Sequence, residues 1–277
     1  MSAAMIEQRE ALLKLLRDDD PTTLELVKEQ LAQAGVEALQ ELRALLAAAD
    51  PEAARHVRDV IASIEEENAD EVFAQLCKNF PEHGDLEDAA WRLAATFFPG
   101  EDFSSQRELL DEWAAEVARR LPKAQSGLDR VETLTEYLSH EVQLRGNEED
   151  YYNIDNSLLP HVIDTGLGIP ISLSLVYMLV GRRAGLRIEG VGLPGHFMVR
   201  YEEIFFDPFH GGRRVGLDEC RALMQQQDLV LKPEHLAATT SRQMLIRILT
   251  NIFYVAERID PLLAAKVADW ISSLRTG

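Results

Sequence analysis

The sequence is poor in cysteine, with only Cys77 and Cys220 among its 277 residues. Two cysteines so far apart are unlike the dense, paired cysteines of small secreted proteins that depend on disulfides. No cluster of cysteine and histidine has the spacing of a structural zinc site. The cysteine content therefore excludes a disulfide scaffold. As a separate expectation, we predict no cofactor.

Long apolar runs are also missing. Residues Met1–Glu10 become charged before the apolar core of a signal peptide can form, and no segment reaches the length of a transmembrane helix. From these two absences we expect a cytoplasmic protein.

Positive charge is scarce, because 28 Lys and Arg stand against 47 Asp and Glu and give a formal net charge of -19. Such a chain repels phosphate backbones and anionic lipid headgroups unless it carries a local basic patch. The pairs Arg182-Arg183 and Arg213-Arg214 have no flanking basic run. The composition excludes nucleic acid and membrane surfaces as expected partners.

Residues 1–80 have the pattern of short amphipathic helices in antiparallel pairs. Both Asp20-Pro21 and Asp50-Pro51 place a capping carboxylate before a proline at the first helical position. The similar starts favour a degenerate, HEAT-like helical repeat. This region is either a binding surface or a helical cap on the next domain. Its apolar stripes are Leu12, Leu15 and Leu16; Leu24, Val27 and Leu31; Leu39, Leu42 and Leu46; and Val57, Val60, Ile61 and Ile64.

Further helices are predicted on both sides of a different central region. The turn-rich segment 81–85 is a plausible boundary, and Trp91 and Trp113 are expected in the core. The predicted helices cover residues 86–98, 106–121 and 128–144 before the central region, and 217–226, 241–258 and 261–274 after it.

The central region combines one buried helix with short strands. Residues 170–183 are apolar on nearly every face, which predicts a helix covered on nearly every side. Strands are expected at 187–193, 196–201 and 203–207, and the joints between them are too short for anything but antiparallel pairing. The fold class is therefore α+β, with a helical N-terminal region, a core with a small antiparallel sheet, and C-terminal helices.

Several motifs in this order resemble the transglutaminase and papain-like core, and more closely its SirB-type branch of bacterial proteins, whose core also occurs in an F-box protein. The resemblance covers about residues 86–251 and implies three parts: a repeat-like region at 1–80, a transglutaminase-like core at 81–235 and a helical hairpin at 236–277. The motifs are Gly146-Asn147-Glu148-Glu149-Asp150-Tyr151-Tyr152, Asn156-Ser157, Gly168-Ile169-Pro170-Ile171-Ser172-Leu173-Ser174, Pro194-Gly195-His196-Phe197 and Asp207-Pro208-Phe209-His210-Gly211-Gly212.

The resemblance also implies the chemistry of a Cys-His-Asp triad with one member missing. His196 matches the imidazole, Asp207 matches the carboxylate that orients it, and Pro170 falls where active members carry the nucleophilic cysteine. The favoured function is therefore a non-catalytic domain that binds a peptide or protein partner in the former active-site cleft. The residues expected to line that cleft are Asn147, Tyr151, Tyr152, Asn156, Pro170, Ser174 and His210.

Three alternatives remain open. Ser172 or Ser174 could serve as nucleophile with His196 and Asp207, which predicts an amide or ester hydrolase or an acyltransferase. The same hydroxyls could instead satisfy groups of the first helical turn, and the His–Asp pair could be a satisfied polar pair in the core. The third alternative is metal binding by His196, Asp207 and His210. No two of these residues have the short sequence spacing of a metal-ligand pair, so no metal site is predicted.

Overall fold

The computed structural model describes residues 11–16 and 20–276, and the segment Met1–Glu10 lies outside them. The chain divides into two compact units. One comprises the described residues up to Phe73 together with Ala95–Glu101, and the other comprises Ala74–Ala94 and the chain from Asp102 onward. The three-part division at 80 and 235 stays a prediction.

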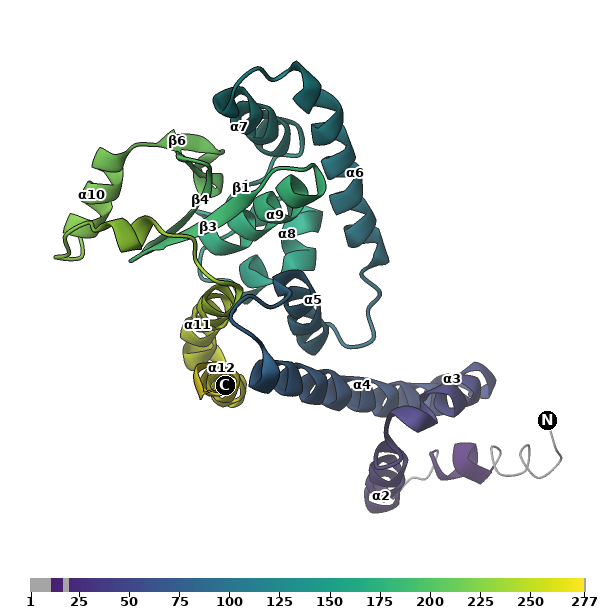
Figure 1. Cartoon of the computed structure of the whole chain (residues 1–277). Coiled ribbons are helices and arrows are strands. Elements are labelled where there is room, and N and C mark those ends of the chain that lie inside the picture. The colour runs from purple at the N-terminus through teal and green to yellow at the C-terminus, as the bar shows by residue number, and fades with distance from the viewer. Residues whose placement is uncertain (1–10, 17–19, 277) are drawn as a thin grey trace. The chain divides into compact units, whose positions relative to one another are not determined.

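The first unit is helical (Figure 1). Its elements are α2 (Pro21–Ala32), the short 3-10 turn η1 (Gly35–Ala38), α3 (Leu39–Ala48) and most of α4 (Pro51–Asn79). The Asp20 carboxylate accepts hydrogen bonds from the backbone N–H groups of Thr22 and Thr23, as predicted for a cap. Asp50 caps α4 in the same way through Glu52 and Ala53.

The four apolar stripes meet in one core cluster, except for Leu15, which is 41% exposed and contradicts its predicted place in the first stripe. Leu16, Leu42, Leu45, Val57 and Ile64 are buried there, and Leu12, Leu24, Val27 and Leu31 pack against them. The expectation of short helices throughout is wrong for α4, which runs for 29 residues. No glycine or proline interrupts the sequence between Glu52 and Asn79, so nothing ends the helix earlier. A repeat of the HEAT type stays a prediction.

The second unit contains the predicted α+β core. Its α9 spans Pro170–Arg183, the limits expected from the sequence, and eleven of its residues are buried. The elements before α9 are α5 (Leu86–Phe97), whose last residues belong to the first unit, α6 (Ser104–Arg120), η2 (Leu121–Lys123), α7 (Gly127–Thr135), the π-helix η3 (Glu136–Glu141), β1 (Arg145–Gly146), η4 (Ile154–Ser157), α8 (Leu159–Thr165) and β2 (Leu167–Gly168).

An antiparallel sheet of four strands follows α9. It consists of β3 (Ile188–Leu193), β4 (His196–Tyr201), β5 (Ile204–Asp207) and β6 (Arg213–Val215), in that order. Between β5 and β6 lies the short turn η5 (Pro208–His210). The sequence predicted the first three strands but not β6, nor the parallel pairing of the two-residue strands β1 and β2.

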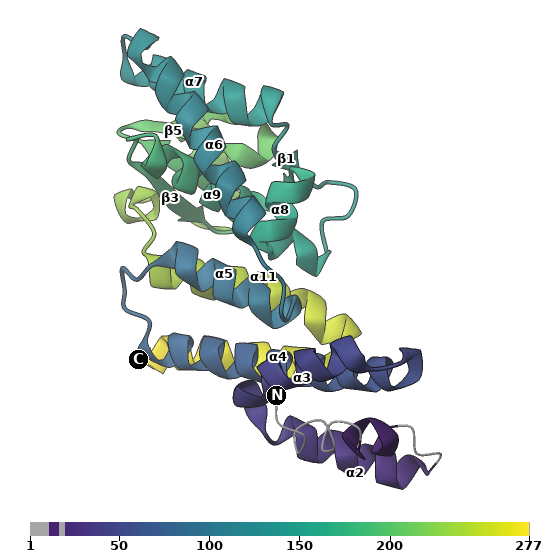
Figure 2. The same ribbon diagram turned by 90° about the vertical axis from the view of Figure 1, so that its right-hand side faces the viewer.

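The helix α9 is covered on two sides. It contacts α6 on one side and strands β3 and β4 on the other (Figures 1 and 2). Gly181 permits the close approach to the sheet, since a Cβ there would stand 2.4 Å from Cγ1 of Ile188. At its C-terminal end Arg182 and Arg183 both pair with Glu87. These contacts hold the C-terminal end of α9 against the sheet and α5.

The remaining helices are α10 (Leu217–Gln225), the 3-10 turn η6 (Pro233–Leu236), α11 (Ser241–Ile259) and α12 (Pro261–Thr276). Cys220 and Met224 of α10 pack with Val191, Met198 and Phe205 on one face of the sheet. The α11 and α12 helices pack against each other. Within residues 11–16 and 20–276, no helix combines the length and the apolar character needed to cross a membrane.

Candidate functional site

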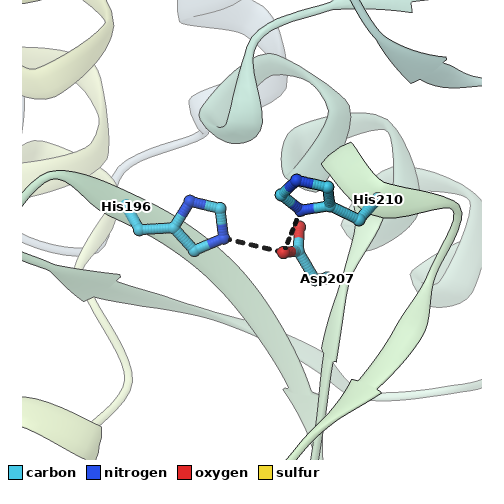
Figure 3. Close-up of side chains that lie close together, drawn as sticks. All are labelled: His196, Asp207 and His210. Atoms are coloured by element: carbon cyan, nitrogen blue, oxygen red, sulfur yellow. Dashed lines mark hydrogen bonds and ion pairs between the residues drawn. The ribbon is translucent and has the colours of Figure 1, made fainter. Parts of the chain in front are cut away.

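Three side chains meet at the end of the sheet. His196 opens β4, Asp207 ends β5 and His210 stands on η5. Nε2 of His196 lies 2.9 Å from Oδ2 of Asp207, and Nδ1 of His210 lies 2.7 Å from the same oxygen. Figure 3 shows the two imidazole rings directed at one carboxylate oxygen from different sides.

The turn after β5 holds the carboxylate in place. Oδ1 of Asp207 accepts a hydrogen bond of 3.0 Å from the backbone N–H of Phe209. The backbone carbonyl of Asp207 accepts another from the N–H of Gly212. Gly211 and Gly212 both have positive φ angles, 69° and 70°, which glycine adopts without strain. These two residues return the chain to β6 and leave His210 beside Asp207.

Asp207 is ionised in this setting. Its side chain is 1% exposed, and burial alone would raise the pKa of the carboxyl group. Hydrogen bonds and charge interactions with His196 and His210 outweigh burial and hold that pKa below its usual value. The guanidinium of Arg213, 3.8 Å from Oδ2, adds a further positive charge, although it pairs more closely with Glu219.

Arg247 supports His196 from α11. Its guanidinium donates hydrogen bonds to the carbonyls of Leu193 and His196, at 2.8 and 2.7 Å, and stacks over the ring of Phe197. These bonds fix both ends of the turn between β3 and β4. Sequence reasoning missed Arg247, because its only local signal is a cation among the apolar residues of a predicted helix.

The serine hydroxyl groups in the first turn of α9 form hydrogen bonds with backbone groups. The Ser172 hydroxyl donates to the carbonyl of Asn156 at 2.6 Å and accepts from the N–H of Ile169 at 3.1 Å. The Ser174 hydroxyl donates to the Pro170 carbonyl at 2.6 Å. Among the described residues, no hydrogen bond joins either hydroxyl to His196. The geometry that the serine-nucleophile alternative requires is therefore not present.

The loop before α8 is tied to the same turn. Asn156 is fully buried, and its amide donates to the carbonyls of Asp150 and Tyr151 while its oxygen accepts from the Asn147 amide. The backbone N–H of Asn147 in turn donates to Gly168. Asn147 and Asn156 thus shape the loop and set the position of Tyr151 and Tyr152.

A row of aromatic rings leads from this loop to the histidines. Ring centroids are 5.4 Å apart for Tyr152 and Tyr151, 6.0 Å for Tyr151 and Phe209, 5.1 Å for Phe209 and His210, and 6.0 Å for His210 and His196. Tyr151 is 37% exposed and Tyr152 is 66% exposed. Gly146 leaves room for the row, since a Cβ there would stand 2.5 Å from the Phe209 ring.

A pocket of about 240 Å³ lies at the tyrosine end of the row. Tyr151 and Tyr152 line one part of it, and Tyr254 and Arg258 of α11 line another. The Arg258 guanidinium stacks over the Tyr152 ring at 5.5 Å. Tyr254 and Arg258 were not identified from the sequence, since they lie about a hundred residues from the loop in the helix α11.

The predicted site residues therefore fall into three groups. His196, Asp207 and His210 meet directly; Tyr151 and Tyr152 lie along the ring row. Five others, which are Asn147, Asn156, Pro170, Ser172 and Ser174, form the turn and loop beside them.

Neither cysteine belongs to this group. Both are buried free thiols, Cys77 in α4 and Cys220 in α10. Burial raises the pKa of Cys77 to about 12 and also raises that of Cys220. Both are therefore protonated, unreactive thiols at neutral pH.

Comparison with known proteins agrees with this architecture. Residues 104–250 match the family model described as "Transglutaminase-like superfamily". A UPF0162 protein of Xylella fastidiosa (strain Temecula1) is 33% identical over 156 residues, which cover 52% of this chain and 56% of that relative. The chain thus spans little more than half the length of this relative. No solved structure matches the chain.

Two further relatives share the core. A UPF0162 protein of Pseudomonas aeruginosa is 28% identical over 197 residues, or 68% of this chain and 72% of the relative. F-box only protein 21 of Mus musculus is 32% identical over 108 residues, or 35% of this chain and 17% of the relative. The resemblance therefore extends to bacterial proteins and to a segment of a mammalian one.

Replacing Ser172 by alanine tests the structural role of its hydroxyl. Ser172→Ala leaves the buried Ile169 N–H and the Asn156 carbonyl without this partner, so the free energy of unfolding should fall by about 1–3 kcal/mol. Ser174→Ala is the matched control and should cost less, about 0.5–1 kcal/mol, because the Pro170 carbonyl keeps its helical hydrogen bond. Urea unfolding measures both, and equal losses would contradict the assignment.

Replacing Asp207 by asparagine tests the electrostatics of the cluster. Asp207→Asn should lower the free energy of unfolding at neutral pH by about 1–3 kcal/mol, because two imidazoles lose a charged acceptor. The pKa of Asp207 is lower in the folded than in the unfolded chain, so this stabilisation is present above about pH 4 and is lost as the pH falls through the folded pKa.

The difference between wild type and Asp207→Asn should therefore narrow in urea titrations as the pH falls from neutral to about 3. The control is Asp218→Asn, whose side chain is 98% exposed and pairs with Arg221 on the same helix. A difference that stays constant with pH for Asp207→Asn would show that the carboxylate charge is not what stabilises the fold.

Proposed function

This chain belongs to the transglutaminase-like superfamily, and from that premise we propose that its former active-site cleft binds a peptide or protein partner without catalysing a reaction. The row of rings from Tyr152 through Tyr151 and Phe209 to His210 carries this proposal. Exposed tyrosines fixed by a rigid loop offer large contact areas at low entropic cost, which is typical of binding surfaces.

The first turn of α9 supports the non-catalytic part of the proposal. In this proposal Pro170 occupies the position of the nucleophile and supplies none, while the neighbouring serine hydroxyls are bonded to backbone groups. His196 and Asp207 are then a base and an orienting carboxylate with no group to activate. This arrangement also supports assigning the chain to the SirB-type branch of the superfamily.

The contact surface proposed here has two parts. Tyr152, Tyr254 and Arg258 form an anchor pocket, and Phe209 with His210 continues the surface toward the sheet. An extended peptide with an aromatic or proline side chain fits such a pocket, because these side chains stack on tyrosine rings. The helices of the first unit, taken as HEAT-like hairpins, would add a separate protein-binding surface.

The anchor pocket can be tested without altering the histidines. Peptides selected from a random display library on the wild-type protein should lose about tenfold or more in affinity for the Tyr152→Ala/Tyr254→Ala variant. Leu262→Ala, which removes an 85% exposed side chain on α12, is the control and should bind as wild type does. Isothermal titration measures the Kd values. Selection of no peptide, or equal binding by the double variant, would refute the pocket.

A cysteine at position 170 tests the assignment of the nucleophile position. In Pro170→Cys the thiol stands at the start of α9, and we expect its pKa to fall below the usual value of about 8.5 because the helix N-terminus and a nearby imidazolium favour thiolate. The thiolate absorbance in the ultraviolet, followed against pH, reports this pKa. The wild-type thiols do not interfere, because burial raises the pKa of both.

Two controls accompany this titration. Ser174→Cys lies one turn further into the same buried helix and should have a raised pKa. Adding His196→Ala to Pro170→Cys should raise the thiol pKa again. An ordinary or raised pKa in Pro170→Cys, in a folded protein, would mean that another residue holds the nucleophile position.

A further inference from the structure

His210 has no role in a Cys-His-Asp arrangement, yet it makes the shortest contact to the central carboxylate. A triad needs one imidazole and one acid, and His196 with Asp207 supplies both. The Nδ1 atom of His210 nevertheless lies 2.7 Å from Oδ2 of Asp207, on the oxygen that His196 also contacts. The second imidazole therefore calls for a different explanation.

The three side chains have the composition and spacing of a metal site. The Nε2 atom of His196, the Nδ1 atom of His210 and a carboxylate oxygen of Asp207 lie within 4.8 Å of one another. Zinc takes imidazole nitrogen and carboxylate oxygen at about 2.0–2.1 Å, so tetrahedral ligands stand about 3.3 Å apart. To reach that value the two nitrogen-to-oxygen separations, 2.9 and 2.7 Å, would widen, and the separation between the two histidine nitrogens, at most 4.8 Å, would shrink. Metal binding by these three residues is one alternative that the sequence leaves open without predicting a site, because no two of them have ligand spacing in sequence and the fold brings them together.

The surroundings supply both rigidity and access. Asp207 is 1% exposed and its second oxygen accepts from the Phe209 N–H, while Arg247 holds the carbonyl of His196. Such outer contacts orient metal ligands. His210 is 44% exposed, which leaves a path for an ion and room for a water as fourth ligand. Arg213, 3.8 Å from the same oxygen, already has Glu219 as a closer partner and can leave the carboxylate.

We propose that His196, Asp207 and His210 bind one zinc ion, with a water completing the coordination. Each histidine would then carry its proton on the nitrogen that faces away from the ion. The proposal does not rest on partner binding, because the ion needs only this chain, and it assigns no reaction to the site.

The test uses the full chain without a histidine tag, freed of metal by a chelator. Competition with a chromophoric zinc chelator should show one equivalent of tightly bound zinc. His210→Ala and Asp207→Asn should each weaken binding on the order of 100-fold or more, since each removes one of three ligands. His83→Ala, in the exposed turn before α5, is the matched control and should leave the affinity unchanged.

Cobalt provides a second readout. The cobalt-loaded protein should show visible bands of a four-coordinate site without a thiolate charge-transfer band, which would separate this cluster from a site that uses Cys77 or Cys220. Circular dichroism of His210→Ala, whose exposed ring can be removed without opening the core, verifies that the variant is folded. Absence of zinc binding, binding unaffected by His210→Ala, or equal loss in His83→Ala would each overturn the proposal.

Discussion

Every polar group in the first turn of a buried helix needs a partner inside the protein, and this requirement shapes the whole site. Pro170 brings no N–H to satisfy, and Ser172 bonds the N–H of Ile169 and the carbonyl of Asn156. The Asn156 amide then holds the carbonyls of Asp150 and Tyr151. Asn156 therefore joins the two, since its backbone carbonyl bonds Ser172 of α9 and its side-chain amide holds the aromatic loop, so the helix start and the loop cannot change independently.

A second set of contacts joins the sheet to the C-terminal helices. Arg247 of α11 bonds the carbonyls of Leu193 and His196, so the turn that presents the imidazole is fixed from outside the sheet. Burial lowers the pKa of Arg247, because the guanidinium loses water there. Two carbonyl acceptors and the Phe197 ring replace that water. The same helix carries Tyr254 and Arg258 to the pocket with Tyr152, so α11 contacts both ends of the row of rings.

The elements that the sequence predicted well are those set by local signals. Asp before Pro marked the starts of α2 and α4, and the apolar run from Pro170 to Arg183 gave the limits of α9. The strands β3 and β4 followed from alternation and from a joint too short for a crossover. The resemblance to the transglutaminase core then brought His196 and Asp207 together, and the structure places them 2.9 Å apart.

What the sequence left out depends on contacts between distant segments. The pairing of β1 with β2 is only two residues long, and Arg247 is joined to His196 across 51 positions. The meeting of Tyr152 with Arg258 requires α11 to pack beside the loop. Neither periodicity nor local residue spacing encodes such contacts, because each depends on where the whole helix or strand lies.

The stability of the fold explains the presence of one of the two histidines at Asp207 better than that of the other. A carboxylate that is 1% exposed needs charged or hydrogen-bonding partners, and removing one of two buried partners leaves the other with an uncompensated charge. This accounts for His196, whose side chain is 13% exposed, and for the N–H of Phe209. It accounts poorly for His210, because the ring of His210 is 44% exposed and would lose little free energy by turning into solvent. The zinc site proposed above gives both rings a ligand to share and so supplies a role for an exposed imidazole directed at this carboxylate.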